Sequence, residues 1–322
     1  MNIDQKNGTI WLAAGLIILL IIMFRLNINL EQTEKKQITI ITKSKYGENW
    51  ETISNGIRAG ANEFGVNIKL LAPDSNKDID AQKTLIQAAT INGTDAIIIA
   101  PIDYHMLDET ISDLNKDKIP VITMVSVSEK YPYKYYIGLD HYETGRKIGQ
   151  VIMKEIGSEG SIALMGMMEL SDDIVLRERG VRDYLKEFTS ITVLETGENS
   201  MGEFSVVTNT KDLLKTHPQI NAIIGLDEEA TRGICLAFKA KKPGVIVVGF
   251  GSSHDIVNQV ELGIIDELVV PNYFGIGYMA IKNTVDYMNQ KDFDRNTYID
   301  PMVIDLDSIY DEDIQKVLFS IQ

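Results

Sequence analysis

Two periods of apolar residues alternate along the chain from Ile38 onward. Ile38–Thr42 and Ala96–Ala100 are short continuous runs of aliphatic residues, which is typical of strands buried on both faces. Between them, Trp50–Phe64 repeats apolar residues every three or four positions and therefore predicts an amphipathic helix. The same two patterns predict strands at 66–72, 121–125, 135–139, 161–165, 191–196, 222–225, 245–250 and near 303, and helices at 80–92, 107–116, 144–156, 174–188, 204–216 and 229–240.

This alternation of strands and helices predicts an α/β fold with parallel sheets covered by helices on both faces. The strands are too many for one sheet of usual size, so we expect two similar units in series, each with about five strands. No Ser/Gly/Pro-rich linker separates the two units. We therefore expect them to be packed together or hinged.

The N-terminal segment has a different pattern. Ile10 to Phe24 is an unbroken run of apolar or small residues, and with Thr9, Arg25 and Leu26 it would form a helix of about 27 Å, close to the hydrocarbon thickness of a bilayer. Neither an A-x-A cleavage site nor a lipidation cysteine follows it. Residues 1–36 are therefore predicted to be an uncleaved single-pass anchor and a short linker, with a removed signal peptide as the alternative.

Composition and charge exclude several classes of function. The chain has 31 basic and 46 acidic residues and a net charge of −15, which argues against a nucleic-acid partner. Its one cysteine, Cys235, is predicted to be a core thiol, and the four histidines have no metal-site spacing. His141 is expected in a surface loop. Because phosphate-loop and nucleophile-elbow motifs are absent, we predict neither an enzyme nor a cofactor or metal.

Candidate ligand-binding residues follow the predicted strands, because ligands of open α/β sheets bind at the carboxyl ends of the strands. Tyr46 and Trp50 could stack on a sugar ring and Asn49 could bond its hydroxyls, although Trp50 could instead begin the core face of its helix. Asp103 could accept bonds from hydroxyls or cap the next helix, and Ser126 follows the fourth strand.

The second half of the chain offers a more strongly polar set. Asp173 and Arg177 follow the strand at 161–165, and arginine presents a rigid fork of donors that suits neighbouring hydroxyls. Asp227 and Asn272 each come directly after a later strand. One acid of the group 227–229 is expected to cap the helix that follows.

Six segments of the chain carry a family resemblance by their order and spacing: Asn55–Ala61, Ala100–Asp103, Ile119–Thr123, Arg177–Gly180, His217-Pro218 and Val247–Phe250. Together they resemble the type I periplasmic binding proteins for sugars, the ribose- and galactose-binding group. The resemblance implies two Rossmann-like lobes, joined by three crossovers, that close around a monosaccharide. It assigns residues 37–140 with 272–298 to one lobe and 141–271 with 299–322 to the other. Repressors of the lactose-repressor type share these lobes but carry a helix-turn-helix where this chain has an apolar segment.

The resemblance also implies roles for single residues. Arg177 matches the family's ligand-binding arginine, and Asp173 matches a hydroxyl-binding aspartate of the galactose binders. Asp227 stands where asparagine is usual. Asn49 and Trp50 replace two aromatic residues of the ribose binders.

The chain also departs from the family pattern in ways that leave the sugar open. Met201 stands where an aromatic lid residue is expected, with Phe204 nearby. Val125 and Ser126 replace an Asp/Asn and an arginine, and Gly251 replaces an aspartate. Asp103, Asp173 or Asn272 could compensate for the lost hydroxyl-binding groups.

Together with the predicted anchor, the resemblance implies a membrane-tethered sugar sensor of Gram-positive bacteria with an extracellular binding domain. The expected ligand is D-xylose or another monosaccharide, and the expected partner is the ectodomain of a LytS-type histidine kinase in a two-component system. One alternative is the binding subunit of an ABC sugar importer, which docks on a permease. A tethered glycosidase and a receptor for an autoinducer-2-type signal are the others.

Overall fold

A computed structural model of the chain describes residues 15–19, 35–116, 119–127, 135–167, 172–194, 196, 202–238 and 244–318. By its internal contacts the chain divides into two units, residues 1–36 and residues 37–322. In the first unit, residues 15–19 are helical, and the rest of the predicted anchor segment lies outside the described residues. Within the described part of the chain, no helix is long and apolar enough to span a membrane.

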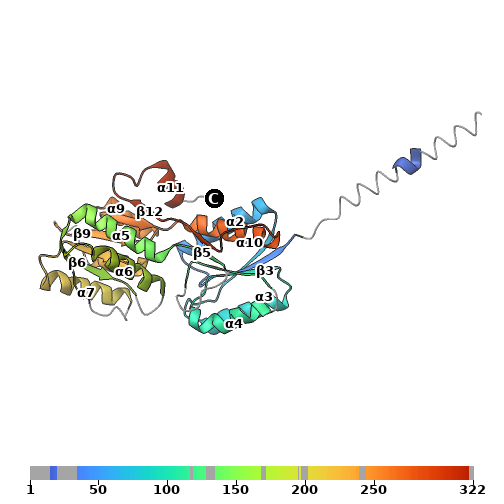
Figure 1. The fold of residues 1–322 in the computed structure, drawn as a ribbon, viewed down its shortest axis with the longest axis horizontal. Helices are drawn as coiled ribbons and strands as arrows, with labels where there is room; N and C mark the ends of the chain where they lie inside the picture. The colour runs from blue at the N-terminus through green and yellow to red at the C-terminus, as the bar shows by residue number, and fades with distance from the viewer. Residues whose placement is uncertain are drawn as a thin grey trace, which may run out of the picture. The chain divides into compact units, whose positions relative to one another are not determined.

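The first lobe is built on a six-stranded sheet with the order β11-β5-β4-β3-β1-β2, in which every neighbouring pair is parallel. Helices α2 (Glu48–Phe64) and α10 (Tyr273–Met288) lie on one face of it, and α3 (Ile79–Ile91) and α4 (Tyr104–Lys116) lie on the other (Figure 1). The strands are β1 (Gln37–Ile41), β2 (Asn67–Leu71), β3 (Ala96–Ile99), β4 (Val121–Met124), β5 (Tyr136–Gly138) and β11 (Asn296–Tyr298).

Side chains of β1 and β3 supply both faces of this sheet, because successive residues of a strand point to opposite sides. Ile40 and Ile98 join the core beneath α2 and α10, whereas Ile41 and Ile99 join the core beneath α3 and α4. All four side chains are fully buried. The continuous apolar runs predicted as strands are therefore strands covered on both faces.

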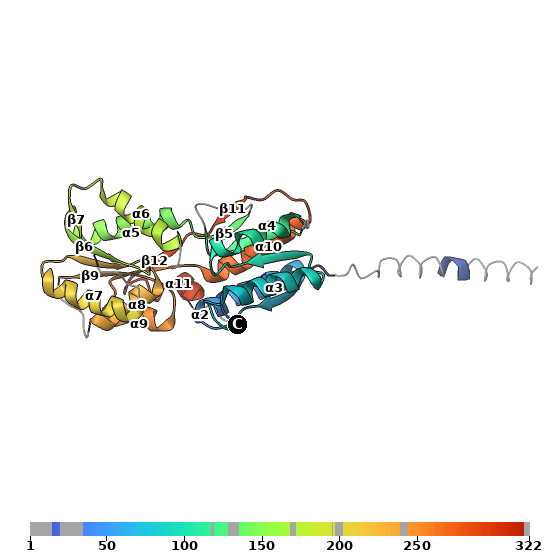
Figure 2. The ribbon, with the colours of Figure 1, turned by 90° about the horizontal axis from the view of Figure 1, so that it is seen from below.

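The second lobe has the same strand order, β12-β10-β9-β8-β6-β7, with β12 antiparallel to β10. Figure 2 shows α7 and α8 side by side in this lobe. Its strands are β6 (Glu159–Met165), β7 (Ser190–Leu194), β8 (Ala222–Gly225), β9 (Ile246–Phe250), β10 (Glu267–Val270) and β12 (Met302–Ile304). Its helices are α5 (His141–Ile156), α6 (Asp172–Leu185), α7 (Glu203–Thr216), α8 (Glu228–Ala237), α9 (His254–Glu261) and α11 (Glu312–Leu318).

The chain passes between the lobes three times, from β5 to α5, from β10 to α10 and from β11 to β12. In each sheet the order of the strands reverses between the first and third strands of the lobe, β1 and β3 or β6 and β8. This switch point is where open α/β sheets bind ligands. The residues that follow these four strands are therefore the first to examine.

One closely packed helix pair supports each lobe. A Cβ atom on Gly56 would lie 2.1 Å from the carbonyl oxygen of Phe274, so only glycine allows α2 and α10 to approach this closely. A Cβ on Gly145 would lie 2.0 Å from the carbonyl oxygen of Arg177, which gives the α5–α6 pair the same requirement. The second contact fixes the backbone of α6 at a predicted ligand-binding residue.

The sequence predicted the strands and the helices up to α8, but several helices begin earlier than expected. Helix α5 starts at His141 instead of 144 because the carboxylate of Asp140 caps it and accepts a bond from Glu143 N at 3.0 Å. Each sheet has six strands, because a short strand after α10 completes each edge; β12 is the strand predicted near 303, whereas β11 was not predicted. Helices α9, α10 and α11 were not predicted.

Candidate ligand-binding site

Arg177 is the central charged residue of the second lobe. It lies on α6, is only 5% exposed, and stacks its guanidinium carbon 4.0 Å from the centroid of the Phe250 ring. Its Nη1 donates to the carbonyl oxygen of Leu226, while its Nε has no hydrogen-bond partner among the described residues. Burial lowers the pKa of Arg177, and Asp173 and Asp227 oppose that shift. A fixed arginine with a spare donor suits a ligand rich in oxygen acceptors.

Asp173 lies one helical turn before Arg177 and is also buried. Its Oδ1 accepts a bond from Val127 N of the first lobe at 2.9 Å and lies 3.5 Å from His141 Nε2. Burial alone would raise the pKa of Asp173, but His141, Lys43, the Val127 N–H and Arg177 together hold that pKa below its usual value. Asp173 therefore joins the two lobes while it remains charged.

Asp227 spans the switch point of the second sheet. Its Oδ1 accepts from Ala230 N at 2.8 Å and caps α8, and its Oδ2 accepts from Met167 N at 2.7 Å. Burial raises the pKa of Asp227, against these two backbone bonds and Arg177. The residue is thus both the predicted helix cap and a fixed acceptor beside Arg177.

The first lobe places its predicted polar residues at the same edge of its sheet. Asp103 caps α4, because its Oδ1 accepts from Met106 N at 3.0 Å. Asn272 caps α10 through a bond of 2.7 Å from Gly275 N. Ser126 is 4% exposed, and its hydroxyl has no partner among the described residues.

Asn49 contacts the opposite lobe directly. Its Nδ2 donates to Glu228 Oε2 at 2.9 Å, and its Oδ1 accepts from Ser252 Oγ at 2.9 Å. Trp50 is half-buried and packs on the core of the first lobe. This agrees with the alternative prediction that Trp50 begins the core face of its helix. Tyr46 is 73% exposed. Met201 lies outside the described residues.

Two acid–histidine contacts also join the lobes at the surface. His105 Nε2 of α4 lies 3.8 Å from Asp172 Oδ2 of α6. In the second contact, the backbone N–H of His254 donates to Glu48 Oε2 at 2.7 Å. In this structure the lobes therefore touch through several polar contacts in addition to the three chain crossovers.

Sequence reasoning left out two residues that the structure places in this region. Lys43, two residues after β1, is half-buried, and burial lowers its pKa while Asp173 and Asp103 act against that shift. Tyr273 comes three residues after β10, and burial and Glu228 raise its pKa. Both residues lie within three residues of the end of a strand, and that position was the available signal.

The backbone after β4 has an uncommon conformation. Val125 has φ of 70°, and Ser126 N bonds to Met124 O at 2.8 Å, which together describe a strained γ-turn. The Val125 carbonyl oxygen lies 3.1 Å from Tyr136 Oη and 3.1 Å from His141 Nε2. Strained backbone of this kind concentrates at functional sites. Here it directs Ser126 and the residue after it toward the second lobe.

The expectation of a surface loop for His141 was wrong. The side chain is 5% exposed because it begins α5 at a crossover and is enclosed by residues of both lobes. Burial lowers its pKa to about 4, against the attraction of Asp173. Cys235 is buried as predicted, and burial raises the pKa of its thiol to about 12.

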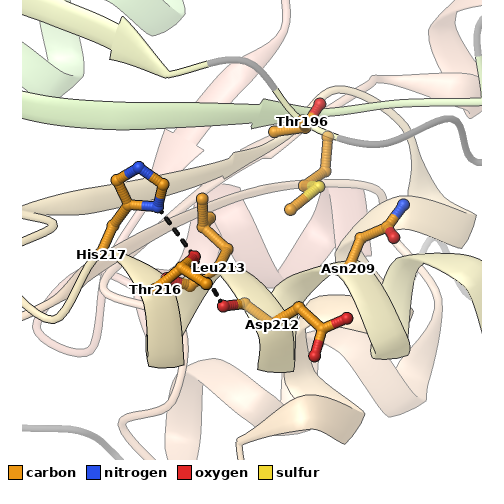
Figure 3. Close-up of a pocket in the computed structure, with 7 residues that line it drawn as sticks. Thr196, Asn209, Asp212, Leu213, Thr216 and His217 are labelled. Carbon is orange, nitrogen blue, oxygen red and sulfur yellow. Dashed lines mark hydrogen bonds between the residues drawn. The ribbon is translucent and has the colours of Figure 1, made fainter.

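A separate hollow of about 160 Å³ lies beside α7 in the second lobe (Figure 3). Thr196 lies across it from α7 and donates to the carbonyl oxygen of Leu164 at 3.1 Å. Thr216 Oγ1 lies 2.9 Å from His217 Nδ1. These polar groups are paired within the lobe, and none of the predicted ligand-binding residues lines the hollow. In the described part of the chain, no group of three or more His, Cys, Asp or Glu side chains could hold a metal ion.

The fold and the polar strand ends together define a two-lobed ligand-binding protein. The chain belongs to the periplasmic binding protein family, because the model for the periplasmic binding protein domain matches residues 38–292. Within that family it is of the type I sugar-binding kind.

Relatives in the family are binding proteins, in agreement with the prediction that this chain is not an enzyme. The ribose import binding protein of Haemophilus influenzae is 26% identical over 216 residues, which cover 66% of this chain and 72% of that protein. The D-apiose import binding protein of Paraburkholderia graminis is 24% identical over 231 residues, 68% of this chain and 70% of its own length.

Solved structures share the fold. A glucose-galactose binding protein from Geobacillus stearothermophilus superimposes with a TM-score of 0.79 at 20% identity, covering 86% of this chain and 100% of that one. The XylFII–LytSN complex contains a chain that superimposes with a TM-score of 0.73 at 23% identity, covering 85% of this chain and 98% of that one.

Proposed function

We propose that this chain is a non-catalytic receptor that binds a monosaccharide between its two lobes. The observation that carries the proposal is the buried Arg177 guanidinium, which keeps a spare donor and is flanked by two fixed carboxylates at the carboxyl end of the second sheet. Arginine–carboxylate sets of this kind match the vicinal hydroxyls of a sugar, which both donate and accept.

The two lobes would contribute different contacts. Arg177, Asp173 and Asp227 come from the lobe that we assign to residues 141–271 with 299–322. Asn49, Asp103 and Ser126 come from the lobe that we assign to 37–140 with 272–298. Closure is then a population shift, driven by contacts that the sugar makes only when both lobes face it. We assign secondary places to Trp50, Tyr46, Asn272 and Met201.

We propose a five-carbon sugar, with D-xylose first. Relatives of the chain include ribose, D-apiose and xylitol binders, and each of those ligands has five carbons. XylFII also shares the fold. Val125 and Ser126 stand where the family has an Asp/Asn and an arginine, so fewer charged groups would face the sugar, and we take this to favour a ligand with fewer hydroxyl substituents.

We propose that the receptor reports ligand occupancy to the ectodomain of a sensor histidine kinase from the outer face of the cell membrane, held there by residues 1–36. The likeness in fold to the XylFII–LytSN complex supports this assignment. The second candidate is the binding subunit of an ABC importer, which the import binding proteins among the relatives favour.

A thermal-shift screen of the purified chain tests the ligand assignment. We expect D-xylose or another pentose to raise the melting temperature by several degrees, because a ligand at a hundred times its Kd adds about 2.7 kcal/mol of stability. Hexoses and an autoinducer-2 preparation serve as competing ligands. The absence of a shift with every compound would reject the sugar-receptor assignment, and hydrolysis of a chromogenic glycoside would show an enzyme instead.

The partner is tested by co-reconstitution. Ligand-dependent association with a histidine kinase ectodomain encoded beside this chain would support sensing. Ligand-dependent stimulation of a neighbouring permease ATPase would support import in its place.

A further inference from the structure

Gln82 is a fully buried amide beside the ends of two central strands of the first sheet. It lies near the start of α3 and is 0% exposed. Its Nε2 donates to the carbonyl oxygens of Ala100 at 2.9 Å and Thr42 at 3.1 Å, while its Oε1 accepts from Ile102 N at 2.9 Å. A glutamine amide has two N–H donors and one carbonyl oxygen, so these three backbone groups use both donors and fix which way the amide points.

The three backbone groups belong to the two segments that leave the first sheet at its switch point. The pairing of β1 with β3 ends at Ile41 and Ile99, and Thr42 and Ala100 are the residues that follow. From here one segment leads to α2 and the other to α4, which cover opposite faces of the sheet. Buried carbonyl oxygens at such a divergence need partners from outside the ladder, and Gln82 supplies one to each segment.

The same amide fixes the backbone beside residues proposed to meet the ligand. Ile102, which donates to Gln82, directly precedes Asp103. On the other segment, the Thr42 hydroxyl donates to the Ser44 carbonyl oxygen at 2.9 Å, within the turn that follows β1. One buried side chain therefore sets the spacing between the two segments that form the ligand-facing edge of the first lobe.

The second lobe joins its strand ends with a group of a different kind. Asp227, which follows β8, accepts from Met167 N, which follows β6, at 2.7 Å. That carboxylate belongs to the candidate site, where Arg177 acts on it electrostatically. Gln82 instead has both of its donors occupied by backbone carbonyls, so its influence on a ligand must pass through the segments that it holds.

We propose that Gln82 is a positioning residue for ligand binding, whose amide holds the two segments at the spacing in which Asp103 can accept a hydrogen bond from a sugar hydroxyl. This inference rests on the proposed function. A neutral amide of this length offers two donors and one acceptor at a single point. A methionine offers none of these groups, and an ionised glutamate offers only acceptors.

The experiment compares the sugar affinities of full-chain variants by calorimetry, with D-xylose, D-ribose and D-galactose as ligands. Gln82→Met keeps the length of the side chain and removes all three bonds, so it should weaken binding of the sugar that the wild type prefers by about 10-fold. Gln87→Met is the matched control, because Gln87 lies on the same helix and is exposed. This variant should bind as the wild type does.

Two further measurements separate positioning from a contribution to stability alone. Urea unfolding gives the folded fraction of each variant, and a purely structural role would lower stability while the folded chain keeps its affinity. Hydrogen exchange reports on the segment itself, because the Ile102 amide is bonded to a buried oxygen. In the folded chain, Gln82→Met should speed exchange at Ile102 by about 10-fold or more and leave exchange at Ile98 within β3 unchanged.

Each outcome counts for or against the role of Gln82. Faster exchange at Ile102 with a sugar affinity within twofold of the wild type would overturn the positioning role and leave the sugar receptor intact, and so would an equal loss of affinity in Gln87→Met. Failure of all three sugars to bind the wild type would overturn the proposed function and this inference with it. If Gln82→Met does not fold, Gln82→Glu takes its place under the same criterion, and rapid exchange of the Ile102 amide in the wild type contradicts the inference without any variant.

Discussion

The two lobes have the same strand order but prepare their ligand-facing edges differently. Two residues after its first strand, the second lobe has Met167, whose backbone N–H is bound by Asp227 at 2.7 Å across the switch point. At the same position the first lobe has Lys43, whose side chain forms no hydrogen bond or ion pair with another described residue. One edge is therefore closed by an internal bond, and the other presents an ammonium that Asp173 and Asp103 influence only electrostatically.

This difference indicates that the two lobes have different roles in ligand binding. Arg177 and Asp227 are held by backbone bonds within the second lobe, so they lose little conformational entropy when a ligand arrives. Lys43 and Ser126 of the first lobe offer donors that no described residue uses. We infer that the second lobe binds the ligand first and that the first lobe completes the site on closure.

The largest expected effect on sugar affinity comes from the second lobe, whose ligand-binding side chains are held by backbone bonds. Arg177→Ala should weaken sugar binding by about 100-fold, because it removes the buried guanidinium whose Nε is available to a ligand, and hydrogen bonds to charged groups contribute about 1.5–3 kcal/mol each. Calorimetric titration of the purified chain checks this. Arg179→Ala is the control, since its guanidinium lies 5.5 Å from the Tyr142 ring centroid, and it should bind nearly as the wild type. Equal affinities for Arg177→Ala and the wild type would contradict the site.

The next largest effect concerns stability, and it compares the α5–α6 helix pair of the second lobe with the α2–α10 pair of the first. Gly145→Ala should destabilise the chain by about 3 kcal/mol, because its Cβ would lie 2.0 Å from the Arg177 carbonyl oxygen and push α5 from α6. Gly60→Ala in the α2–α10 pair meets its nearest atom at 3.1 Å and should be milder. Urea unfolding of both variants measures the difference, and equal losses would show that the α5–α6 contact is not the tighter one.

The crossover between the lobes should respond to pH through His141. Its pKa is lowered to about 4 in the folded chain, so the unfolded chain takes up the proton first as pH falls. Stability from this residue is complete above pH 6.5 and is lost progressively toward pH 4, by about 3 kcal/mol in total. Denaturant melts at pH 7 and pH 5 should show a smaller loss in His141→Gln than in the wild type.

Asp173 limits the pH window of that experiment. Its pKa is held below the usual value, so its own contribution is lost only at more acidic pH, as its carboxylate is protonated. Between pH 7 and pH 5 Asp173 therefore stays charged, and the difference between the wild type and His141→Gln isolates the histidine. A pH dependence unchanged by His141→Gln would show that another group is responsible.

The smallest effect concerns the direct contact between the lobes. Asn49→Ala removes bonds to Glu228 and Ser252, each of 2.9 Å, and should change ligand affinity by about fivefold through about 1 kcal/mol. The same calorimetric titration measures it. Thr52→Ala on the same helix is the control, because the Thr52 hydroxyl donates to the Glu48 carbonyl oxygen within α2. A loss as large as that of Arg177→Ala would show that Asn49 belongs with the fixed ligand-binding residues.

The sequence alone determined the fold class, because strand and helix periods are local properties that single segments such as Ile38–Thr42 and Trp50–Phe64 carry. It also placed Arg177, Asp173 and Asp227 after strands, where α/β sheets bind ligands. Helices α9 and α11 were missed because they are short, with 8 and 7 residues, and their apolar period repeats too few times to be recognised.

Only the tertiary structure decided which polar residues have partners. Asn49 bonds to Glu228, which is 179 residues away, and His141 is buried because two lobes enclose one crossover. The electrostatic surroundings of the Lys43 ammonium depend likewise on the positions of Asp103, Asp173 and Arg177. Such facts concern distances between segments remote in the chain, and the period of apolar residues within a segment contains no information about them.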